Sequence, residues 1–218
     1  MPHVSRETNS KKRCLKKLRK RIICKLDPMR TLFILLVLSA IAIPNFAQLK
    51  YERETRIKRG DVPKDALNFI DSLNFGSRIK WYKEIGLETI AYEAKTKSAG
   101  NRYSIKFLQD GSLVDVEIEV KPNELPDETY SAITKYLANK HNKYSIEKIQ
   151  IQYTGEPSII LEFLQGKRSD SDLKKNYEIV ISSKVDRTYT MLEYLFSSKG
   201  EFIHELQIVL NRTENIVY

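Results

Sequence analysis

Cysteine is scarce in this chain of 218 residues. Both cysteines, Cys14 and Cys24, precede an apolar segment, and residues 48–218 contain none. That part of the chain therefore cannot form a disulfide, a thiolate metal site or a cysteine nucleophile. It is long enough to bury a core without covalent staples, because a chain of this size buries roughly 70% of its surface on folding.

Histidine and catalytic motifs are also scarce. After residue 48 only His141 and His204 remain, and neither lies in a metal-binding spacing. His141 is expected to end a helix, where the helix dipole favours it, and the orientation of His204 in its strand depends on a bulge after Gly200. The chain has no GxSxG element, no glycine-rich phosphate loop and no CxxC pair. We therefore expect no catalytic residues, no metal and no cofactor.

A basic excess is confined to the start of the chain. The formal charge is +9, and residues 1–30 supply all of it, with eleven Lys or Arg against two Asp or Glu. Residues 31–218 carry 26 basic and 26 acidic side chains. Nucleic-acid binding needs a concentrated basic surface, so this balance argues against nucleic acid as a partner.

Residues 30–47 have the pattern of a cleavable secretory signal peptide. Leu32–Ile43 is a run of twelve apolar or small residues, which fits a signal peptide and is shorter than the ~20 residues of a membrane span. Pro44 ends this run, and Ala47 provides a small residue for cleavage before Gln48. We therefore expect a periplasmic or secreted protein whose working part begins at Gln48.

Residues 1–28 form an unusual basic arm ahead of this segment. Met29 would make an ordinary start, so translation from Met29 is one interpretation. In the other, the apolar segment stays uncleaved as a signal anchor and the arm lies at the inner leaflet, as the positive-inside rule requires. Membrane contact is expected only through an uncleaved signal segment.

The first half of the exported part predicts one helix followed by four strands. After an extended segment over residues 48–61, Val62-Pro63-Lys64 opens a helical pattern, with proline in the first turn where its missing N–H costs nothing. Alternating apolar residues then mark four strands, at Ile79–Ile85, Ile90–Ala94, Tyr103–Phe107 and Val114–Val120. The short joints between them, including Asp110-Gly111, predict an antiparallel meander.

The second half repeats this layout. Leu125-Pro126 opens a second helix, and an insertion over Gly155–Lys174 is expected to hold a short one, Ile159–Leu164. Strands are predicted at Tyr144–Tyr153, Tyr177–Ser183, Tyr189–Phe196 and Phe202–Leu210.

The two halves also match locally. Phe107 followed by Gly111 corresponds to Phe196 followed by Gly200. The predicted fold class is α+β, with tandem units of a helix packed on a four-stranded antiparallel meander sheet, preceded by a signal peptide. The first unit spans residues 62–122 and the second spans residues 123–218.

Several segments resemble one family. The signal segment ends in AQ, and VPKDALNFIDSL, KWYKEIGLE, YEAKT, YSIKFLQDGSLVDVEIEV and KIQIQY follow it. Over Val62–Leu210 the chain resembles the PepSY-like family of exported Bacteroidota proteins, which is similar to the beta-lactamase inhibitor protein. The resemblance implies tandem helix-on-sheet units, a periplasmic or secreted location, and binding or inhibition of another protein, with an exported peptidase as one candidate partner.

Three carboxylates offer an alternative function. Asp115, Glu117 and Glu119 lie on one face of a predicted strand, and neighbouring carboxylates can bind a hard cation or act as acid and base. Ser104 and Lys106 are expected on the same face of the next strand, so cross-strand charge pairing explains the pattern better. A carboxylate-based metal-binding or hydrolytic envelope enzyme is therefore kept as the alternative.

The polar face of the sheet is the candidate binding surface. Trp81 is expected to pack under the first helix, so Tyr82 points to the opposite, solvated face, where an exposed tyrosine among charges is typical of a protein interface. The predicted surface consists of Tyr82, Lys95, Lys106 and Glu117. The leading hypothesis is an exported, non-catalytic module that binds an unidentified protein and inhibits or regulates it. A structural envelope component is the third hypothesis.

Overall fold

The computed structural model describes residues 48–50, 53–86, 89–185 and 187–209. Ala47, the segment interpreted as a signal peptide and the basic arm before it lie outside these residues. The described strands are β1 (Gln48–Lys50), β2 (Arg53–Ile57), β3 (Lys80–Ile85), β4 (Ile90–Ser98), β5 (Asn101–Leu108), β6 (Leu113–Glu119), β7 (Tyr144–Thr154), β8 (Lys174–Val185), β9 (Thr188–Ser197) and β10 (Phe202–Ile208). The described α-helices are α3 (Lys64–Leu73), α4 (Asp127–Lys140) and α5 (Pro157–Leu164). None of them is long and apolar enough to cross a membrane.

All ten described strands belong to one sheet. Their order is β1-β10-β9-β8-β7-β6-β5-β4-β3-β2. Every neighbouring pair is antiparallel except β1 with β10, which is parallel. The two halves of the chain join through β6 and β7, where Val116 pairs with Tyr153. The fold is therefore α+β with one continuous ten-stranded sheet, where the sequence analysis expected four strands in each unit.

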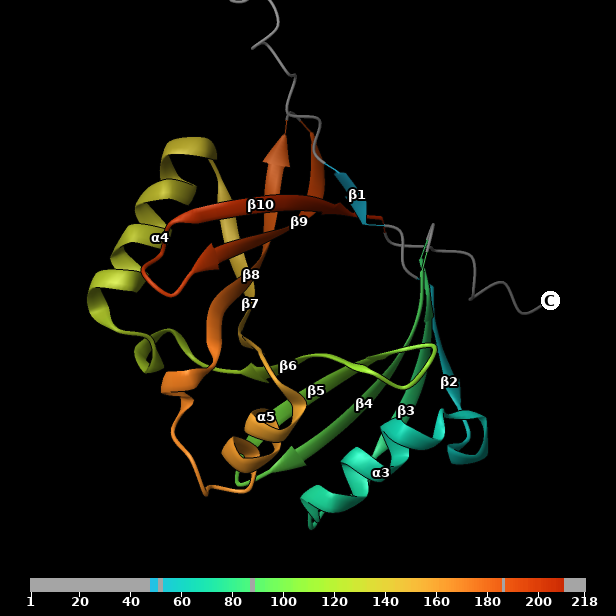
Figure 1. The fold of residues 1–218 in the computed structure, drawn as a ribbon. Helices are drawn as coiled ribbons and strands as arrows, with labels where there is room; N and C mark the ends of the chain where they lie inside the picture. The colour runs from blue at the N-terminus through green and yellow to red at the C-terminus, as the bar shows by residue number, and fades with distance from the viewer. Residues whose placement is uncertain (1–47, 51–52, 87–88, 186, 210–218) are drawn as a thin grey trace, which may run out of the picture. The chain divides into compact units, whose positions relative to one another are not determined.

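The two edge strands of this sheet are neighbours in the sequence. β1 ends at Lys50 on one edge, and β2 begins at Arg53 on the other. Three Cα–Cα steps span at most about 11 Å, so the two edges come together at this point. Figure 1 shows the sheet curling round with the helices on its outer side. β1 and β2, in a segment expected only to be extended, are thus the strands at which the two edges of the curled sheet meet.

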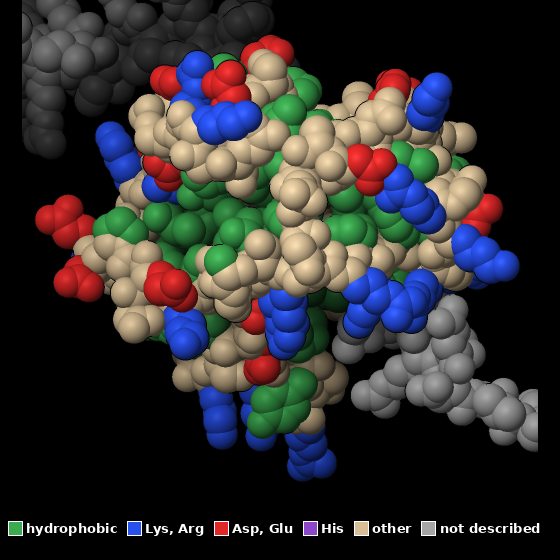
Figure 2. Space-filling view, turned by 90° about the horizontal axis from the view of Figure 1, so that it is seen from below, with side chains coloured by type: hydrophobic (Ala, Val, Ile, Leu, Met, Phe, Trp, Pro, Cys, Tyr) green, Lys and Arg blue, Asp and Glu red, His purple; other side chains and the backbone are tan. Residues whose placement is uncertain are grey.

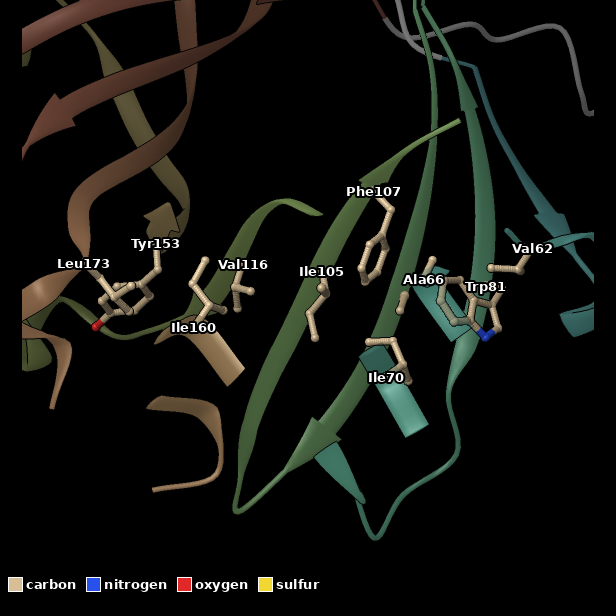
Figure 3. Close-up of a cluster of buried hydrophobic side chains, with 11 residues drawn as sticks. Val62, Ala66, Ile70, Trp81, Ile105, Phe107, Val116, Tyr153, Ile160 and Leu173 are labelled. Carbon is tan, nitrogen blue, oxygen red and sulfur yellow. The ribbon is translucent and has the colours of Figure 1, made fainter. Parts of the chain in front are cut away.

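The first hydrophobic core lies between the sheet and the helices α3 and α5 (Figure 3). Ala66 and Ile70 are one turn apart on α3 and are buried against it, and Ile160 of α5 joins the same cluster. Trp81 is 4% exposed, and its ring centroid lies 6.1 Å from that of Phe107. The prediction that this tryptophan packs beneath the first helix is confirmed.

The second core lies under α4. Ile133 and Leu137 are four residues apart and therefore share one helix face. Both are fully buried against Tyr177, Tyr194 and Phe196 of β8 and β9. Each long helix thus covers its own half of the sheet, and α5, which lies in the predicted insertion, packs on the first core.

Both long helices begin with the same local motif. A single 3-10 turn precedes each helix, over Arg59–Asp61 and Pro122–Glu124, and a buried apolar residue and a proline follow it. In the first turn the Lys58 backbone N–H donates to Asp61 Oδ2 at 3.3 Å. In the second turn the Lys121 backbone N–H donates to Glu124 Oε2 at 2.6 Å. The pattern lysine, two residues, acid, apolar residue, proline is readable in the sequence, and the sequence analysis did not notice it.

A hairpin glycine packs on the first turns of each long helix. Gly111 and Gly200 have φ angles of 89° and 80°, in the left-handed region that glycine tolerates. A Cβ on Gly111 would lie 3.0 Å from Asp65 Cβ, and one on Gly200 would lie 2.8 Å from the Thr129 carbonyl oxygen. The phenylalanine-to-glycine match in the sequence therefore corresponds to a contact that the two halves share.

Candidate functional site

The face of the sheet that points away from the helices is called the concave face below. Strand register decides which side chains reach it, because successive residues point to opposite faces. Trp81, Ala94 and Ile105 pair across β3, β4 and β5 on the helix side, so the adjacent row points to the concave face. That row consists of Tyr82, Glu93 and Lys106. All four predicted binding residues, Tyr82, Lys95, Lys106 and Glu117, share the concave face.

The concave face is largely buried, which corrects the expectation of a solvated face. Five of its carboxylates are only 5% to 7% exposed, namely Glu84, Glu93, Asp115, Glu178 and Glu193. Tyr82 is half-buried, and Lys95 Nζ lies 5.0 Å from the centre of its ring. The reason is the curl of the sheet, which brings its two edges together over this face and cannot be read from strand alternation.

Lysines supply the counter-charge for the first group of buried carboxylates. Lys106 Nζ lies 2.8 Å from Glu84 Oε2. Lys95 Nζ lies 2.9 Å from Glu93 Oε2 and 2.7 Å from Glu54 Oε2. A buried carboxylate without such a partner destabilises the fold strongly, so these pairs are required wherever the carboxylates are ionised.

At the other end of the concave face, lysines again provide the counter-charge for buried carboxylates. Lys50 Nζ lies 2.8 Å from Glu193 Oε2, and Lys148 Nζ lies 3.8 Å from Glu178 Oε1. Lys50 belongs to β1, and Glu54, which forms an ion pair with Lys95, belongs to β2. The segment that closes the sheet therefore contributes one charge to each end of the concave face.

The surroundings separate the pKa values of these carboxyls. Burial raises the pKa of Glu84 to about 8, although Lys106 opposes the shift. Burial, followed by repulsion from Glu117, raises the pKa of Asp115 to about 7. Burial also favours a raised pKa for Glu93, but hydrogen bonds from Glu84 and the charge of Lys95 lower it overall. The Glu84 carboxyl therefore binds a proton more readily than the Glu93 carboxyl.

The three carboxylates of β6 share a strand face, as predicted, but have separate partners. Asp115 Oδ2 accepts a hydrogen bond from Gln152 Nε2 at 3.0 Å, and Glu117 Oε2 accepts one from Gln150 Nε2 at 2.9 Å. Glu119 forms an ion pair with an arginine of β5 at 3.3 Å. Lys106 lies opposite Asp115 in the strand register, as expected. The arrangement is one of cross-strand pairing.

A tighter carboxylate group comes from three different strands. The carboxylate oxygens of Glu54, Glu84 and Glu93 lie within 4.8 Å of one another. The sequence held no signal for this group, because nothing in it showed that β2 pairs with β3, which places Glu54 opposite Glu84. Lys95 and Lys106 contact the same carboxylates and already offset their charge.

Two grooves are hollowed into the concave face. The first has a volume of about 550 Å³ and is lined from β3 to β7 by residues that include Arg78 and Gln150. The second has a volume of about 500 Å³ and lies where the two ends of the sheet meet, between Lys50 and Glu84. Both volumes lie in the range of small-ligand sites.

Three of the four predicted binding residues line these grooves. Lys95 and Glu117 line both, and Lys106 lines the second. Tyr82 lies on the same face without lining either groove. The sequence analysis missed Arg78, whose position before β3 held no periodic signal.

The outer side of the molecule has a different character. Figure 2 views it from the side of α3 and α5 and shows hydrophobic side chains gathered in the middle, with charged side chains at the rim. Half-buried residues of α3 and α5, such as Phe69, Leu73 and Phe163, pack on the first core. The middle of this side is an extension of the core, and the buried carboxylates lie on the concave face.

His141 has a structural role that the sequence did not reveal. It ends α4, as predicted, and its ring bridges two strands, with Nδ1 2.9 Å from Ser183 Oγ and Nε2 2.7 Å from the Tyr194 hydroxyl. Burial and the neighbouring Lys140 lower its pKa, so the neutral ring acts as a hydrogen-bonding link, which corrects the helix-dipole interpretation. Ser183 is 1% exposed, so its hydroxyl is closed to solvent. His204 is exposed and lies beside a bulge in β10.

Comparison with known proteins gives low similarities. No protein-family model and no curated protein matches the chain. A DUF2874 family protein from Bacteroides ovatus is 13% identical with a TM-score of 0.47, over 68% of this chain and 89% of that one. A second DUF2874 family protein, from Bacteroides uniformis, is 14% identical with a TM-score of 0.46, over 67% and 89%. A BLIP-like protein from Bacteroides fragilis is 19% identical with a TM-score of 0.41, over 70% and 91%. None of these three descriptions carries the PepSY-like name, so the resemblance to that family stays a prediction.

Proposed function

We propose that this chain is an exported, non-catalytic module that binds another protein through its concave face. The observation that carries the proposal is that Lys95 and Glu117 line both grooves of a hollow face that Lys106 and Tyr82 share. Ion pairs with buried carboxylates hold Lys95 and Lys106 in place, and a hydrogen bond from Gln150 holds Glu117. A surface ordered before binding loses little conformational entropy when a partner docks, and a protruding loop or an extended segment suits a concave shape.

In its narrower form, the proposal names the partner class. The partner would be an exported enzyme, such as a peptidase, that this module inhibits or regulates. This form rests on the sequence resemblance and on the scarcity of catalytic residues after residue 48. An inhibition assay on a captured enzyme would test it directly.

Affinity capture tests the proposal. The purified protein is immobilised, the envelope and secreted proteins of the source organism are passed over it, and retained proteins are identified by mass spectrometry. Tyr82→Ala removes a ring from the concave face without unpairing a carboxylate, and Tyr189→Ala is its control because Tyr189 is 62% exposed and lines neither groove. Glu117→Ala is paired with Glu128→Ala on the exposed side of α4.

We expect one saturable partner that both concave-face variants weaken and both controls leave unchanged. A partner retained equally by Tyr82→Ala and Glu117→Ala would contradict the proposed surface. A blank with the wild-type protein would favour the structural envelope component.

Export has its own test. N-terminal sequencing of the protein recovered outside the cytoplasm is expected to begin at Gln48. Recovery of the intact basic arm in the membrane fraction would instead support the signal anchor. A start after Ala42 would move the cleavage site to the alternative small-residue triplet, Ala40-Ile41-Ala42.

We also infer that residues 62–122 and 123–218 are tandem copies of one unit of a helix and four strands. Two features support this proposal, namely the shared 3-10 turn with its acid-to-backbone hydrogen bond, and the contacts of Gly111 and Gly200 with the helix that precedes them. Both features position the helix on the strands that follow it, and both occur once in each half of the chain.

Cation binding is the second candidate function, because Glu54, Glu84 and Glu93 converge. Calorimetric titration of the protein with Ca²⁺ and with Zn²⁺ decides between the two. The protein-binding proposal expects no stoichiometric heat. Stoichiometric binding that Glu54→Gln abolishes would favour a carboxylate-based metal site or hydrolase.

A further inference from the structure

The first groove has an uneven charge distribution. Six of the side chains that line it are basic and three are acidic. Three of these cations are already paired, namely Lys95 with Glu93, Arg102 with Glu119 and Lys148 with Glu178. The other cations at the mouth of the groove are exposed, and no ion-pair partner is found for them in the described part of the chain. They are Arg78, Lys80 and Lys97, and they are called the basic lip below.

The strand register places like charges directly opposite each other at this lip. Lys80 pairs with Lys95 across β3 and β4, and Lys97 pairs with Arg102 across β4 and β5. Like charges in such positions destabilise a sheet. Two of these cations have partners elsewhere, but Lys80 and Lys97 add repulsion that nothing in the described residues offsets. A bound anion would relieve it.

The floor of the same groove contains a buried hydrogen-bond acceptor without a donor. Gln150 is 6% exposed, and its Nε2 donates to Glu117 Oε2 at 2.9 Å. This bond determines the orientation of the amide, because an ionised carboxylate only accepts hydrogen bonds. Gln150 Oε1 is then a buried acceptor without a donor. Buried acceptors in proteins are nearly always satisfied, by protein or by ordered water, and an N–H of a molecule bound in the groove would satisfy this one.

We propose that this groove binds an acidic peptide segment of the partner protein, with its carboxylates at the basic lip and a main-chain N–H directed to Gln150 Oε1. This inference rests on the proposed function and adds the chemical character of the partner. An acidic peptide supplies both the acceptors that the lip lacks and the donor that the floor lacks. A fully ionised inorganic anion supplies only the first.

A binding assay tests the inference. The probe is a fluorescein-labelled peptide of alternating glutamate and glycine, titrated with the purified protein and followed by anisotropy at low and at physiological salt. Arg78→Glu and Lys97→Glu reverse charges at the lip. Lys135→Glu and Lys199→Glu make the same change at exposed positions outside the groove. Circular dichroism checks that each variant is folded, and Arg78→Gln is a milder second variant.

We expect saturable binding that weakens at least tenfold in each charge-reversal variant of the lip, changes less than twofold in the controls, and weakens as salt rises. The same peptide built with lysine in place of glutamate should not bind. A peptide N-methylated along its main chain should bind at least fivefold more weakly, because it has no N–H for Gln150.

Three results would overturn the inference. The first is no saturable binding of the glutamate peptide. The second is equal binding of the N-methylated peptide, and the third is full displacement by millimolar sulfate, a fully ionised anion without an O–H, each of which would indicate a simple anion site. The capture experiment separates this inference from the proposed function. A partner retained equally by wild type and by Arg78→Glu would support the proposed function and refute the acidic segment. Peptide binding without any captured partner would support a site for acidic peptides and refute the proposed protein-binding function.

Discussion

Lys50 Nζ lies 3.0 Å and 2.8 Å from the two carboxylate oxygens of Glu193, so the strand at one edge of the sheet is tied to β9 across β10. Glu193 is 7% exposed. Loss of a counter-charge beside a buried carboxylate is costly, so we expect Lys50→Ala to lower the free energy of unfolding by about 2 kcal/mol. Urea unfolding measures this change.

The same variant should loosen the sheet edge locally. Hydrogen exchange at Leu206–Ile208, which pair with β1, is expected to become faster while exchange in β5 stays unchanged. Lys174→Ala, at an exposed position of β8, is the control. Equal losses of stability in the two variants would show that the contact between Lys50 and Glu193 does not hold the edge.

Asp115 should make stability depend on pH. Burial raises its pKa to about 7, above the value of about 3.9 in an unfolded chain. Between these values the folded state binds more protons than the unfolded state, so the free energy of unfolding contributed by this carboxyl falls as pH rises. Asp115→Asn keeps an acceptor for Gln152 and removes the titration.

We therefore expect Asp115→Asn to match the wild type near pH 4 and to be more stable at pH 8, by roughly 2 kcal/mol. Urea unfolding followed by the fluorescence of Trp81, the single tryptophan, measures both points. Asp110→Asn provides the contrast, because hydrogen bonds from Ser112 lower the pKa of Asp110, so this variant should gain no stability at pH 8. A gain at pH 8 in both variants would refute the assignment to Asp115.

Alanine substitutions at Gly200 and Gly100 distinguish the cost of close packing from the cost of backbone strain. Both have positive φ angles, 80° and 87°, but a Cβ on Gly200 would meet Thr129 and Ala132 of α4, whereas a Cβ on Gly100 would meet nothing within 4 Å. We expect Gly100→Ala to cost about 1 kcal/mol and Gly200→Ala about 3 kcal/mol, because overpacking adds to the strain. Thermal and urea unfolding compare the two, and equal costs would show that the hairpin does not press on the helix.

His141 is expected to act as a hydrogen-bonding link between α4 and the sheet. His141→Ala leaves the buried Ser183 hydroxyl without its partner, so we expect a loss of about 1 to 3 kcal/mol at pH 7.5. The pKa of His141 is lowered in the folded state, so the unfolded chain binds the proton more readily and the contribution of this ring fades as pH falls below about 6.5.

The difference between wild type and His141→Ala should therefore shrink between pH 7.5 and pH 5.5. His204→Ala is the control, because His204 is exposed on β10. A difference that stays constant over this range would show that the ring does not titrate in that window.

Local signals were sufficient for the helices and for most of the strands. Pro63 and Pro126 mark the entry to α3 and α4 because proline suits a helix start, and alternation marks β5 because one of its faces packs on the core. The same logic assigned Trp81 to the core. Each of these predictions depends on neighbours within about ten residues, where sequence pattern and structure are directly linked.

The candidate site needed more than local signals. Alternation placed Tyr82, Lys95, Lys106 and Glu117 on one face, and the structure agrees. It failed on the solvation of that face, because a pattern of two faces cannot distinguish an open sheet from a curled one. Gln150 was missed for a related reason, since its neighbour Glu117 lies on a strand 33 residues earlier in the chain.

By itself the sequence determined the helix starts, the alternation of the strands, the hairpin glycines and the scarcity of cysteine and histidine after residue 48. These features depend on backbone sterics and side-chain chemistry that each short segment carries. Only the tertiary structure decided that β6 pairs with β7, that Lys50 and Arg53 stand on opposite edges of one sheet, and that carboxylates distant in the chain gather in a buried hollow. The physical reason is that strand pairing over long separations is chosen by the total burial and charge balance of the folded chain, which no single segment contains.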